Sequence, residues 1–168
     1  MAVKPLIFVL GGARSGKSRR AEALVTAFPA PWTYIATAEA FDSEMESRIA
    51  EHRVRREAGW QTVDAPRDLP AALRAATTPV LVDCLTLWLS NAMLAEADLA
   101  AEGAALEAAL AVRRGPVVLV SNEVGSGIVP ATPLGRRFRD AQGALNQRIA
   151  AMADQVEFVV AGLTLRLK

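Results

Sequence analysis

Short apolar runs alternate along the chain with longer stretches in which apolar residues recur at helical spacing. Residues 6–10, 80–83 and 117–121 are nearly continuous apolar runs without polar alternation. Such runs are typical of strands at the centre of a parallel sheet that is covered on both faces. A fourth run, residues 33–37, follows a proline-containing break and predicts another strand.

The stretches between these runs predict helices. Apolar residues recur at helical spacing within residues 15–28, about 43–58, 85–90, 91–111 and 134–152. Two further strands, 157–161 and 163–167, are divided by a glycine and predict a closing strand pair. Strands that alternate with helices indicate an α/β fold of three layers, with a mostly parallel central sheet and helices on both of its faces.

Composition narrows the class of protein. A chain of 168 residues, 52% of them apolar, is long enough to bury a core and indicates a single domain over residues 1–168. A net charge of +1 disfavours a nucleic-acid partner. The single cysteine, Cys84, excludes an intrachain disulfide and is compatible with a reducing cytoplasm. No apolar run approaches the roughly 18 residues of a membrane span.

The clearest motif is a glycine-rich segment between a predicted strand and a predicted helix. It reads G-x-x-x-x-G-K-S, with the residues Gly11, Gly12, Ala13, Arg14, Ser15, Gly16, Lys17 and Ser18. Backbone N–H groups of such a loop bind phosphate oxygens, the lysine reaches the β- and γ-phosphates, and the serine hydroxyl binds Mg²⁺. A chance match is disfavoured because pattern and strand–loop–helix context agree.

Asp83 ends the apolar run 80–83 and is the candidate second ligand of Mg²⁺. The alternative is an aspartate that caps the following helix. We favour the metal role because a phosphate loop needs such a partner. These residues predict a Mg²⁺–nucleotide site, but they do not distinguish a metabolite kinase from a nucleotide-driven ATPase.

His52 is the only histidine and lies among arginines. On a helix, Met45, Ile49 and Arg56 share its stripe, which is compatible with a structural role beside packed apolar residues. The nearby guanidinium groups disfavour the imidazolium form, and a neutral imidazole is a competent nucleophile toward phosphorus. Residue chemistry alone leaves both roles open.

Two polar residues, Asn122 and Glu123, follow the run 117–121 at the predicted carboxyl edge of the sheet, where ligands of open α/β sheets bind. We expect a substrate or nucleotide contact there, the alternative being a tight connection with a solvated Glu123. Trp60 and Trp88 are expected to anchor the core or an interface rather than to bind a ligand.

Five segments together resemble one family. They read GGARSGKS at 11–18, YIATA at 34–38, RIAEHRVRREAGWQTV at 48–63, DCLTLWLSN at 83–91 and SNEVGSGIVPATPLGRRFRDAQGALNQ at 121–147. The chain resembles the bifunctional adenosylcobinamide kinase / adenosylcobinamide-phosphate guanylyltransferases of cobalamin biosynthesis over nearly its whole length. The resemblance implies a RecA-like phosphate-loop fold, a homotrimer, and ATP and GTP as substrates.

The resemblance also implies two reactions and their residues. Adenosylcobinamide is phosphorylated by ATP or GTP, and GMP then passes from GTP through a histidine to adenosylcobinamide phosphate. His52 matches the guanylylated histidine. The nucleotide-binding positions of the family match Ala36, Thr37, Ala38, Arg53, Val54, Arg55, Arg56, Asp64 and Asp83. Asp64 stands where the family more often has glutamate. The alternatives are a simple metabolite kinase with a structural His52 and a nucleotide-switched binding protein without an acceptor.

Overall fold

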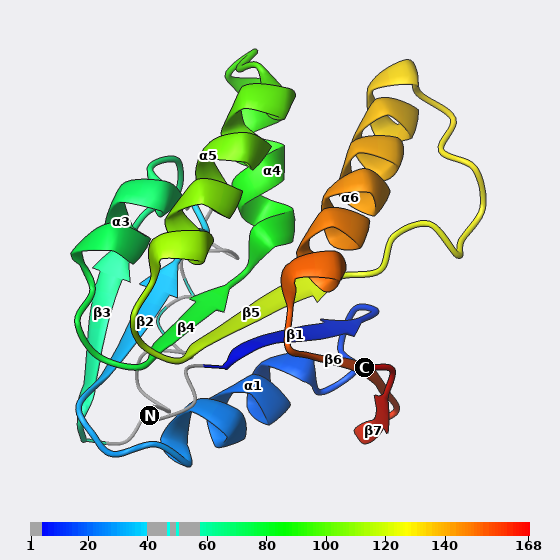
Figure 1. The fold of residues 1–168 in the computed structure, drawn as a ribbon. Helices are drawn as coiled ribbons and strands as arrows, with labels where there is room; N and C mark the ends of the chain where they lie inside the picture. Colours follow the sequence, from blue (N-terminus) through cyan, green and yellow to red (C-terminus); the bar gives the residue numbers. More distant parts are fainter. Residues whose placement is uncertain (1–4, 40–46, 48–49, 51–57) are drawn as a thin grey trace.

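The computed structural model describes residues 5–39, 47, 50 and 58–168. Within them one sheet has the strand order β3-β2-β4-β5-β1-β6-β7 (Figure 1). The strands are β1 (Leu6–Gly11), β2 (Trp32–Ala36), β3 (Trp60–Asp64), β4 (Val80–Asp83), β5 (Val117–Asn122), β6 (Gln155–Val160) and β7 (Leu163–Arg166). Neighbouring strands are parallel except for the antiparallel pair β6–β7.

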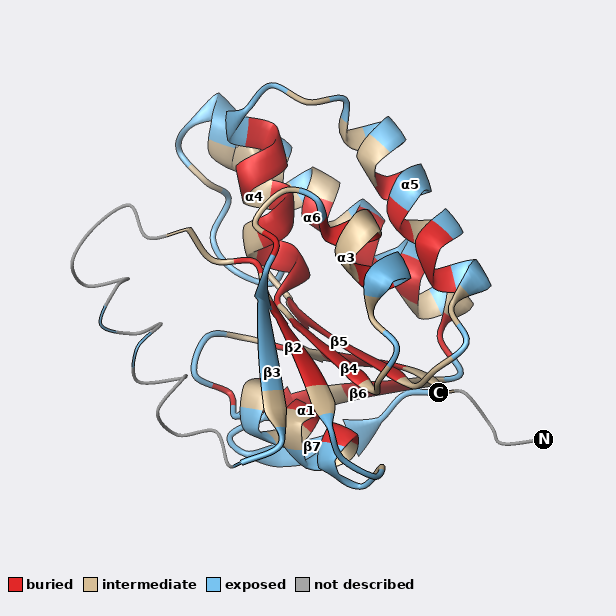
Figure 2. Ribbon diagram, turned by 90° about the vertical axis from the view of Figure 1, so that its left-hand side faces the viewer, coloured by how far each residue is buried: buried red, intermediate tan, exposed pale blue. Residues whose placement is uncertain are grey.

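The described helices cover both faces of this sheet. They are α1 (Lys17–Thr26), α3 (Leu69–Ala75), α4 (Leu85–Leu94), α5 (Leu99–Val112) and α6 (Pro133–Met152). Helix α1 lies on one face, and α3, α4, α5 and α6 lie on the other (Figures 1 and 2). The predicted three-layer α/β fold with a closing strand pair is therefore confirmed.

Strand β5 shows how one apolar run supplies both cores. Val118 and Val120 pack in the cluster that includes Ala21 and Val25 of α1. Val117, like Leu119, packs in the cluster on the opposite face. Alternation of side chains along a strand produces this division, and burial on both faces explains why the run contains no polar position before its end (Figure 2).

One predicted helix was wrong, and two elements were not predicted. The expected helix over 91–111 is interrupted, because α4 ends at Leu94 and α5 begins at Leu99. The side chain of Asp98 accepts hydrogen bonds from the backbone N–H groups of Ala100 and Ala101, which starts a new helix. Strand β3 and helix α3 were missed. The predicted helix over about 43–58 lies mostly outside the described residues.

Two observations complete the fold. Trp88, which we expected to anchor the core, is fully buried and donates its indole N–H to the carbonyl of Arg67 at 2.8 Å. Among the described helices, none has the length and apolar character needed to cross a membrane.

Candidate active site

The phosphate-loop motif connects the end of β1 to the start of α1, as its sequence predicts. A Cβ atom at Gly11 would lie 2.5 Å from Ser15 Oγ and 2.7 Å from the carbonyl oxygen of Val159, so only glycine fits there. Gly16 precedes α1 with a φ of 95°, a conformation that favours glycine. The backbone path of the loop therefore depends on these two glycines.

Lys17 is the first residue of α1, and its side chain is turned back over the loop. Its Nζ donates a hydrogen bond to the carbonyl oxygen of Gly12 at 2.9 Å, and the residue is 9% exposed. The N-cap residue Gly16 provides no side-chain acceptor, so the first N–H groups of α1 have no side-chain cap. Such N–H groups, with the positive end of the helix dipole, can bind a phosphate. Ser18 lies half-buried in the same turn.

The β6–β7 turn supports the loop from outside. The N–H of Gly162 donates to the carbonyl oxygen of Ser15 at 2.8 Å. The backbone at Gly16 also lies close to this turn, because a Cβ atom at Gly16 would be 3.3 Å from Gly162 Cα. The C-terminal strand pair is thus in direct contact with the phosphate loop.

Asp83 ends β4 and is half-buried. Its Oδ2 accepts a hydrogen bond from the Tyr34 hydroxyl at 3.1 Å. The N-cap position of α4 is Cys84, so Asp83 is not the cap of that helix and the capping alternative is wrong.

A divalent cation would find few protein ligands here. Among the described residues no group of three or more His, Cys, Asp or Glu side chains could hold a metal. Mg²⁺ commonly takes one or two protein oxygens and completes its octahedron with phosphate oxygens and water. Ser18 and Asp83 supply a hydroxyl and a carboxylate, so the donor set fits Mg²⁺ in the presence of a nucleotide.

The segment after β2 was predicted to contact nucleotide. Thr37 is fully buried, and its Oγ1 donates to the carbonyl of Cys84 at 2.6 Å and accepts from the Cys84 N–H at 2.8 Å. The hydroxyl of Thr37 therefore joins the ends of β2 and β4. Ala36 and Ala38 are half-buried on either side of it. A nucleotide contact of this segment stays a prediction.

Of the other predicted site residues, the structure describes Asp64 but not residues 52–56. Asp64 ends β3, is exposed, and lies in register with Ala36 on β2. The remaining predicted residues, which include the candidate nucleophile, lie outside the described residues: His52, Arg53, Val54, Arg55 and Arg56. Their roles stay predictions.

A buried polar network at the end of β5 was not predicted. Ser121 Oγ donates to Asn146 Oδ1 at 2.7 Å, and Gln142 Nε2 donates to Ser121 Oγ and to Asn146 Oδ1, each at 2.9 Å. Asn146 Nδ2 donates to the carbonyl of Asn122 at 3.1 Å. Gln142 and Asn146 lie four residues apart on α6, beside the buried Leu145. In the sequence, the only sign of this network is that the two amides Gln142 and Asn146 lie on the same helical face as apolar residues of α6.

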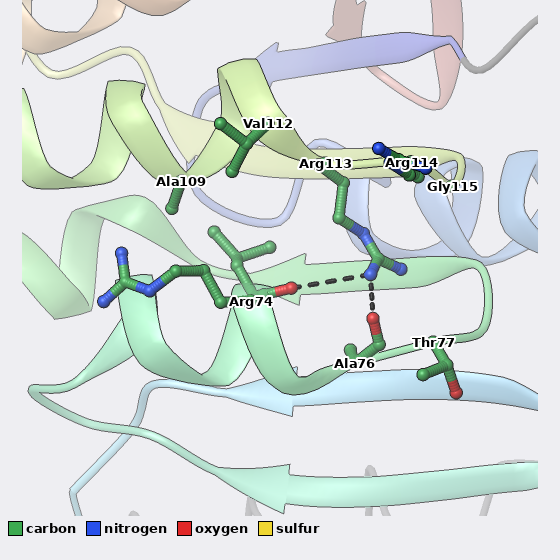
Figure 3. Close-up of a pocket in the computed structure, with 9 residues that line it drawn as sticks. Arg74, Ala76, Thr77, Ala109, Val112, Arg113, Arg114 and Gly115 are labelled. Atoms are coloured by element: carbon green, nitrogen blue, oxygen red, sulfur yellow. Dashed lines mark hydrogen bonds between the residues drawn. The ribbon is translucent and has the colours of Figure 1, made fainter.

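A recess of about 360 Å³ lies at the opposite edge of the sheet, between the C-terminal ends of α3 and α5 (Figure 3). Arg113 donates a hydrogen bond there to the carbonyl of Ala76, near the end of α3 (Figure 3). It also donates to the carbonyl of Thr78. Burial lowers the pKa of Arg113. Its guanidinium group satisfies backbone carbonyls, so we assign this recess a structural role.

The chain is similar to known proteins over nearly its whole length. Residues 7–167 match the family model CobU, described as cobinamide kinase / cobinamide phosphate guanyltransferase. The bifunctional adenosylcobalamin biosynthesis protein CobP of Pseudomonas aeruginosa is 50% identical over 165 residues, which cover 95% of each chain. CobU of Salmonella typhimurium, also named bifunctional, is 42% identical over 181 residues, which cover 97% of this chain and 99% of the relative. A prototypical ATPase from a bacterial type III secretion system has a TM-score of 0.49 at 10% identity, covering 96% of this chain and 56% of that one.

Proposed function

The chain belongs to the cobinamide kinase / cobinamide phosphate guanyltransferase family, and on that premise we propose that it catalyses both reactions of cobalamin biosynthesis. It phosphorylates adenosylcobinamide with ATP or GTP, and it then transfers GMP from GTP to adenosylcobinamide phosphate. The products of the second reaction are adenosylcobinamide-GDP and pyrophosphate. The observation that carries the proposal is the phosphate loop, whose lysine and uncapped helix start lie at the edge of the sheet where Asp83 ends β4.

In the kinase step, this chain binds and orients the nucleotide. The N–H groups of the first turn of α1 bind phosphate oxygens, and the ammonium of Lys17 exchanges the carbonyl of Gly12 for the β- and γ-phosphates. Ser18 and Asp83 would hold Mg²⁺, which supplies charge neutralisation on the phosphates. The hydrogen bond from Tyr34 orients the Asp83 carboxylate. Residues 11–18 and Asp83 thereby stabilise charge that develops on the transferring group.

In the second step, His52 is the nucleophile. Its imidazole nitrogen attacks the α-phosphorus of GTP, and pyrophosphate leaves with the electrons of the broken bond. A phosphate oxygen of adenosylcobinamide phosphate then displaces the imidazole and forms the new diphosphate. Arg53, Arg55 and Arg56 neutralise phosphate charge during both displacements. This assignment is supported by the match of residues 48–63 to the family.

The proposed oligomeric state, location and nucleotide substrates rest on the same resemblance. We propose a homotrimer in the cytoplasm, with ATP and GTP as nucleotide substrates and no nucleic-acid partner. Ala36, Thr37, Ala38, Val54 and Asp64 complete the proposed nucleotide contacts.

Two labelling experiments test the proposal. GTP labelled at the α-phosphate should leave acid-labile, base-stable label on the protein, and His52→Ala should abolish that label. ATP labelled at the γ-phosphate should transfer its label to adenosylcobinamide, and Lys17→Ala should reduce this transfer at least about 100-fold, as expected for loss of a principal phosphate ligand. Unlabelled wild-type protein, or full labelling of His52→Ala, would exclude the histidine intermediate. GTP hydrolysis without transfer would instead indicate a nucleotide switch.

A further inference from the structure

We propose that Asn91 is a positioning residue of the guanylyl-transfer step, because its single carboxamide joins the ends of the two strands between which the chain carries His52. The inference rests on the proposed function, to which it adds a residue outside the phosphate loop and outside residues 48–63. Asn91 itself contacts neither the nucleotide nor the acceptor. It acts through the backbone that it holds.

Asn91 is an amide at a buried position of a mostly apolar helix. It lies in the second half of α4, is 6% exposed, and has the buried residues Trp88 and Ala92 beside it. Burying a carboxamide costs free energy unless its N–H groups find acceptors. Both are used here, since Nδ2 donates to the carbonyl of Thr37 at 2.9 Å and to the carbonyl of Pro66 at 3.0 Å. The amide is therefore a specific cross-link.

The two acceptors lie at the ends of neighbouring strands. Thr37 directly follows β2, and Pro66 comes two residues after the end of β3. These strands are parallel, and the N–H of Ala65 donates to the carbonyl of Ala36 at 2.8 Å. Asn91 adds its cross-link one residue further along each chain. A side-chain donor is suited to this place, because two carbonyl oxygens cannot bond to each other.

The part of the chain between these two points carries the residues of the second reaction. Residues 38–65 include His52 and the arginines that follow it. The proposed nucleotide contacts at residues 36–38 and at Asp64 adjoin the same two points. A change in the separation of Thr37 and Pro66 is passed on to this segment, because both of its ends are set there. A misplacement of about 1 Å can slow a reaction about 100-fold.

Other hydrogen bonds fix each point separately. The hydroxyl of Thr37 bonds to the backbone of Cys84, which ties the end of β2 to the end of β4. Trp88 Nε1 donates to the carbonyl of Arg67 at 2.8 Å, which ties the chain after β3 to α4. In the described part of the chain, Asn91 is the one side chain that donates to both points. Its loss should therefore uncouple them without releasing either.

The phosphate-loop site is held by different contacts. Helix α4 covers the face of the sheet opposite to α1 (Figure 1). Lys17 bonds to the carbonyl of Gly12, and the hydroxyl of Tyr34 bonds to Asp83. Neither contact involves Asn91. Loss of its carboxamide should thus affect guanylylation more than phosphorylation.

The step that depends on this positioning is the attack of His52 on GTP. A phosphorus–nitrogen bond forms at the α-phosphorus while the bond to the bridging oxygen breaks. The electron pair of that bond leaves with pyrophosphate, and the imidazole proton passes to water. The nitrogen has to approach within a narrow range of distance and direction, which a fixed backbone provides. Asn91 exchanges no proton or electron.

The test compares the two reactions in the full chain with Mg²⁺. Single-turnover labelling with α-labelled GTP gives the rate of guanylylation, and γ-labelled ATP with adenosylcobinamide gives the kcat of the kinase step. Asn91→Leu roughly keeps the side-chain volume and removes both donors. We expect about 10- to 100-fold slower guanylylation and a kinase kcat within about threefold of wild type. Asn91→Asp should be no faster than Asn91→Leu, because its carboxylate repels the two carbonyls.

Trp88→Phe is the matched control, because it removes a hydrogen bond from the same helix to the carbonyl of Arg67 alone. It should leave the ratio of the two rates unchanged. A purely structural role of Asn91 predicts that both rates fall together with the folded fraction, which circular dichroism measures. Equal loss of both rates in Asn91→Leu, an unchanged rate of guanylylation, or the same selective loss in Trp88→Phe would overturn the proposal. If Asn91→Leu does not fold, Asn91→Ser replaces it.

Amide hydrogen exchange gives a readout that needs no activity. In Asn91→Leu, peptides that cover residues 32–39 and 58–68 should exchange at least about fivefold faster, and peptides that cover residues 6–26 should be unchanged. Unchanged exchange in the first two regions would contradict the coupling. Absence of label on the wild-type protein would refute the guanylyl step of the proposed function. The exchange comparison would still decide whether Asn91 holds the two strand ends together.

Discussion

The ion pair between Arg20 and Glu157 gives the sharpest stability prediction. Arg20 lies on α1, three residues after Lys17, and its Nε and Nη2 each donate to one carboxylate oxygen of Glu157 on β6 at 2.8 Å. The Glu157 side chain is 4% exposed, whereas that of Arg20 is 38% exposed. Removing Arg20 therefore leaves a buried carboxylate without its main partner, and removing Glu157 leaves a cation that water can reach.

The magnitude follows from these exposures. Losing one partner of a fully buried pair costs about 3–5 kcal/mol. An exposed pair is worth about 0.2–1 kcal/mol. Because solvent screens Arg20, we expect about 2 kcal/mol less stability for Arg20→Met, between these limits. Glu157→Gln should cost less, about 1 kcal/mol. In a chain of this length, about 2 kcal/mol corresponds to a decrease in Tm of about 4–8 °C.

The cost should depend on pH. The hydrogen bonds from Arg20 hold the pKa of Glu157 below its ordinary value. A carboxyl with a lowered folded-state pKa stabilises the fold above its unfolded pKa of about 4.3, and this contribution is lost as the pH falls through the folded value. In Arg20→Met, burial instead disfavours the charged carboxylate. The difference in unfolding free energy between wild type and variant should therefore shrink on acidification.

Urea denaturation at several pH values between 7 and 3.5 measures this difference. Arg19→Met, at an exposed position of the same helix, is the control and should stay within about 0.5 kcal/mol of wild type. A cost below about 0.5 kcal/mol for Arg20→Met at pH 7 would show that solvent screens the pair as fully as a surface pair. A cost that stays constant with pH would refute the assigned role of Glu157 ionisation.

Three further predictions concern the loop and its surroundings. Gly11→Ala should abolish nucleotide binding in titration calorimetry, because the new Cβ would meet the Val159 carbonyl oxygen at 2.7 Å; retained affinity would contradict the close packing of the loop. Burial raises the pKa of the Cys84 thiol to about 11, so a thiol reagent at pH 8 should label the unfolded chain but not the native one. Ala161 has a φ of 51°, which asparagine tolerates better, so Ala161→Asn should add about 1 kcal/mol of stability in thermal melts; an unchanged or lower Tm would refute this.

The phosphate loop and the central strands could be predicted because their sequence signals are direct. A motif with fixed glycine and lysine spacing specifies a backbone path, and residues 80–83 and 117–121 are apolar because they are buried on both faces. Strand β3 gave no such signal. It is an edge strand whose residues after Trp60 are all exposed, so it contains no apolar run.

The two errors in predicting helices also have causes in the local sequence. Helix α3 contains Pro70, a residue type that usually interrupts a helix, yet proline is tolerated in the first helical turn, where its missing N–H is not needed. The expected helix over 91–111 is split by Glu96, whose φ of 55° leaves helical geometry, and by the Asp98 cap. High alanine content gave the whole segment helical propensity and hid this boundary.

The end of β5 shows why the face to which each side chain points was harder to predict than the strand itself. In a continuous apolar run, the sequence does not say which alternate positions face α1 and which face α6. The structure assigns them, and the two faces then have different tasks. Ser121 faces α6 and joins the buried amides that hold the strand. Asn122 faces α1 and is in register with Gly11 of β1, and Val120, two positions earlier on the same face, is in register with Asp83 of β4. Alternation thus separates the side chains of consecutive residues, so that Ser121 joins the buried network beside α6 while Asn122 lies on the face of the sheet that carries the phosphate loop.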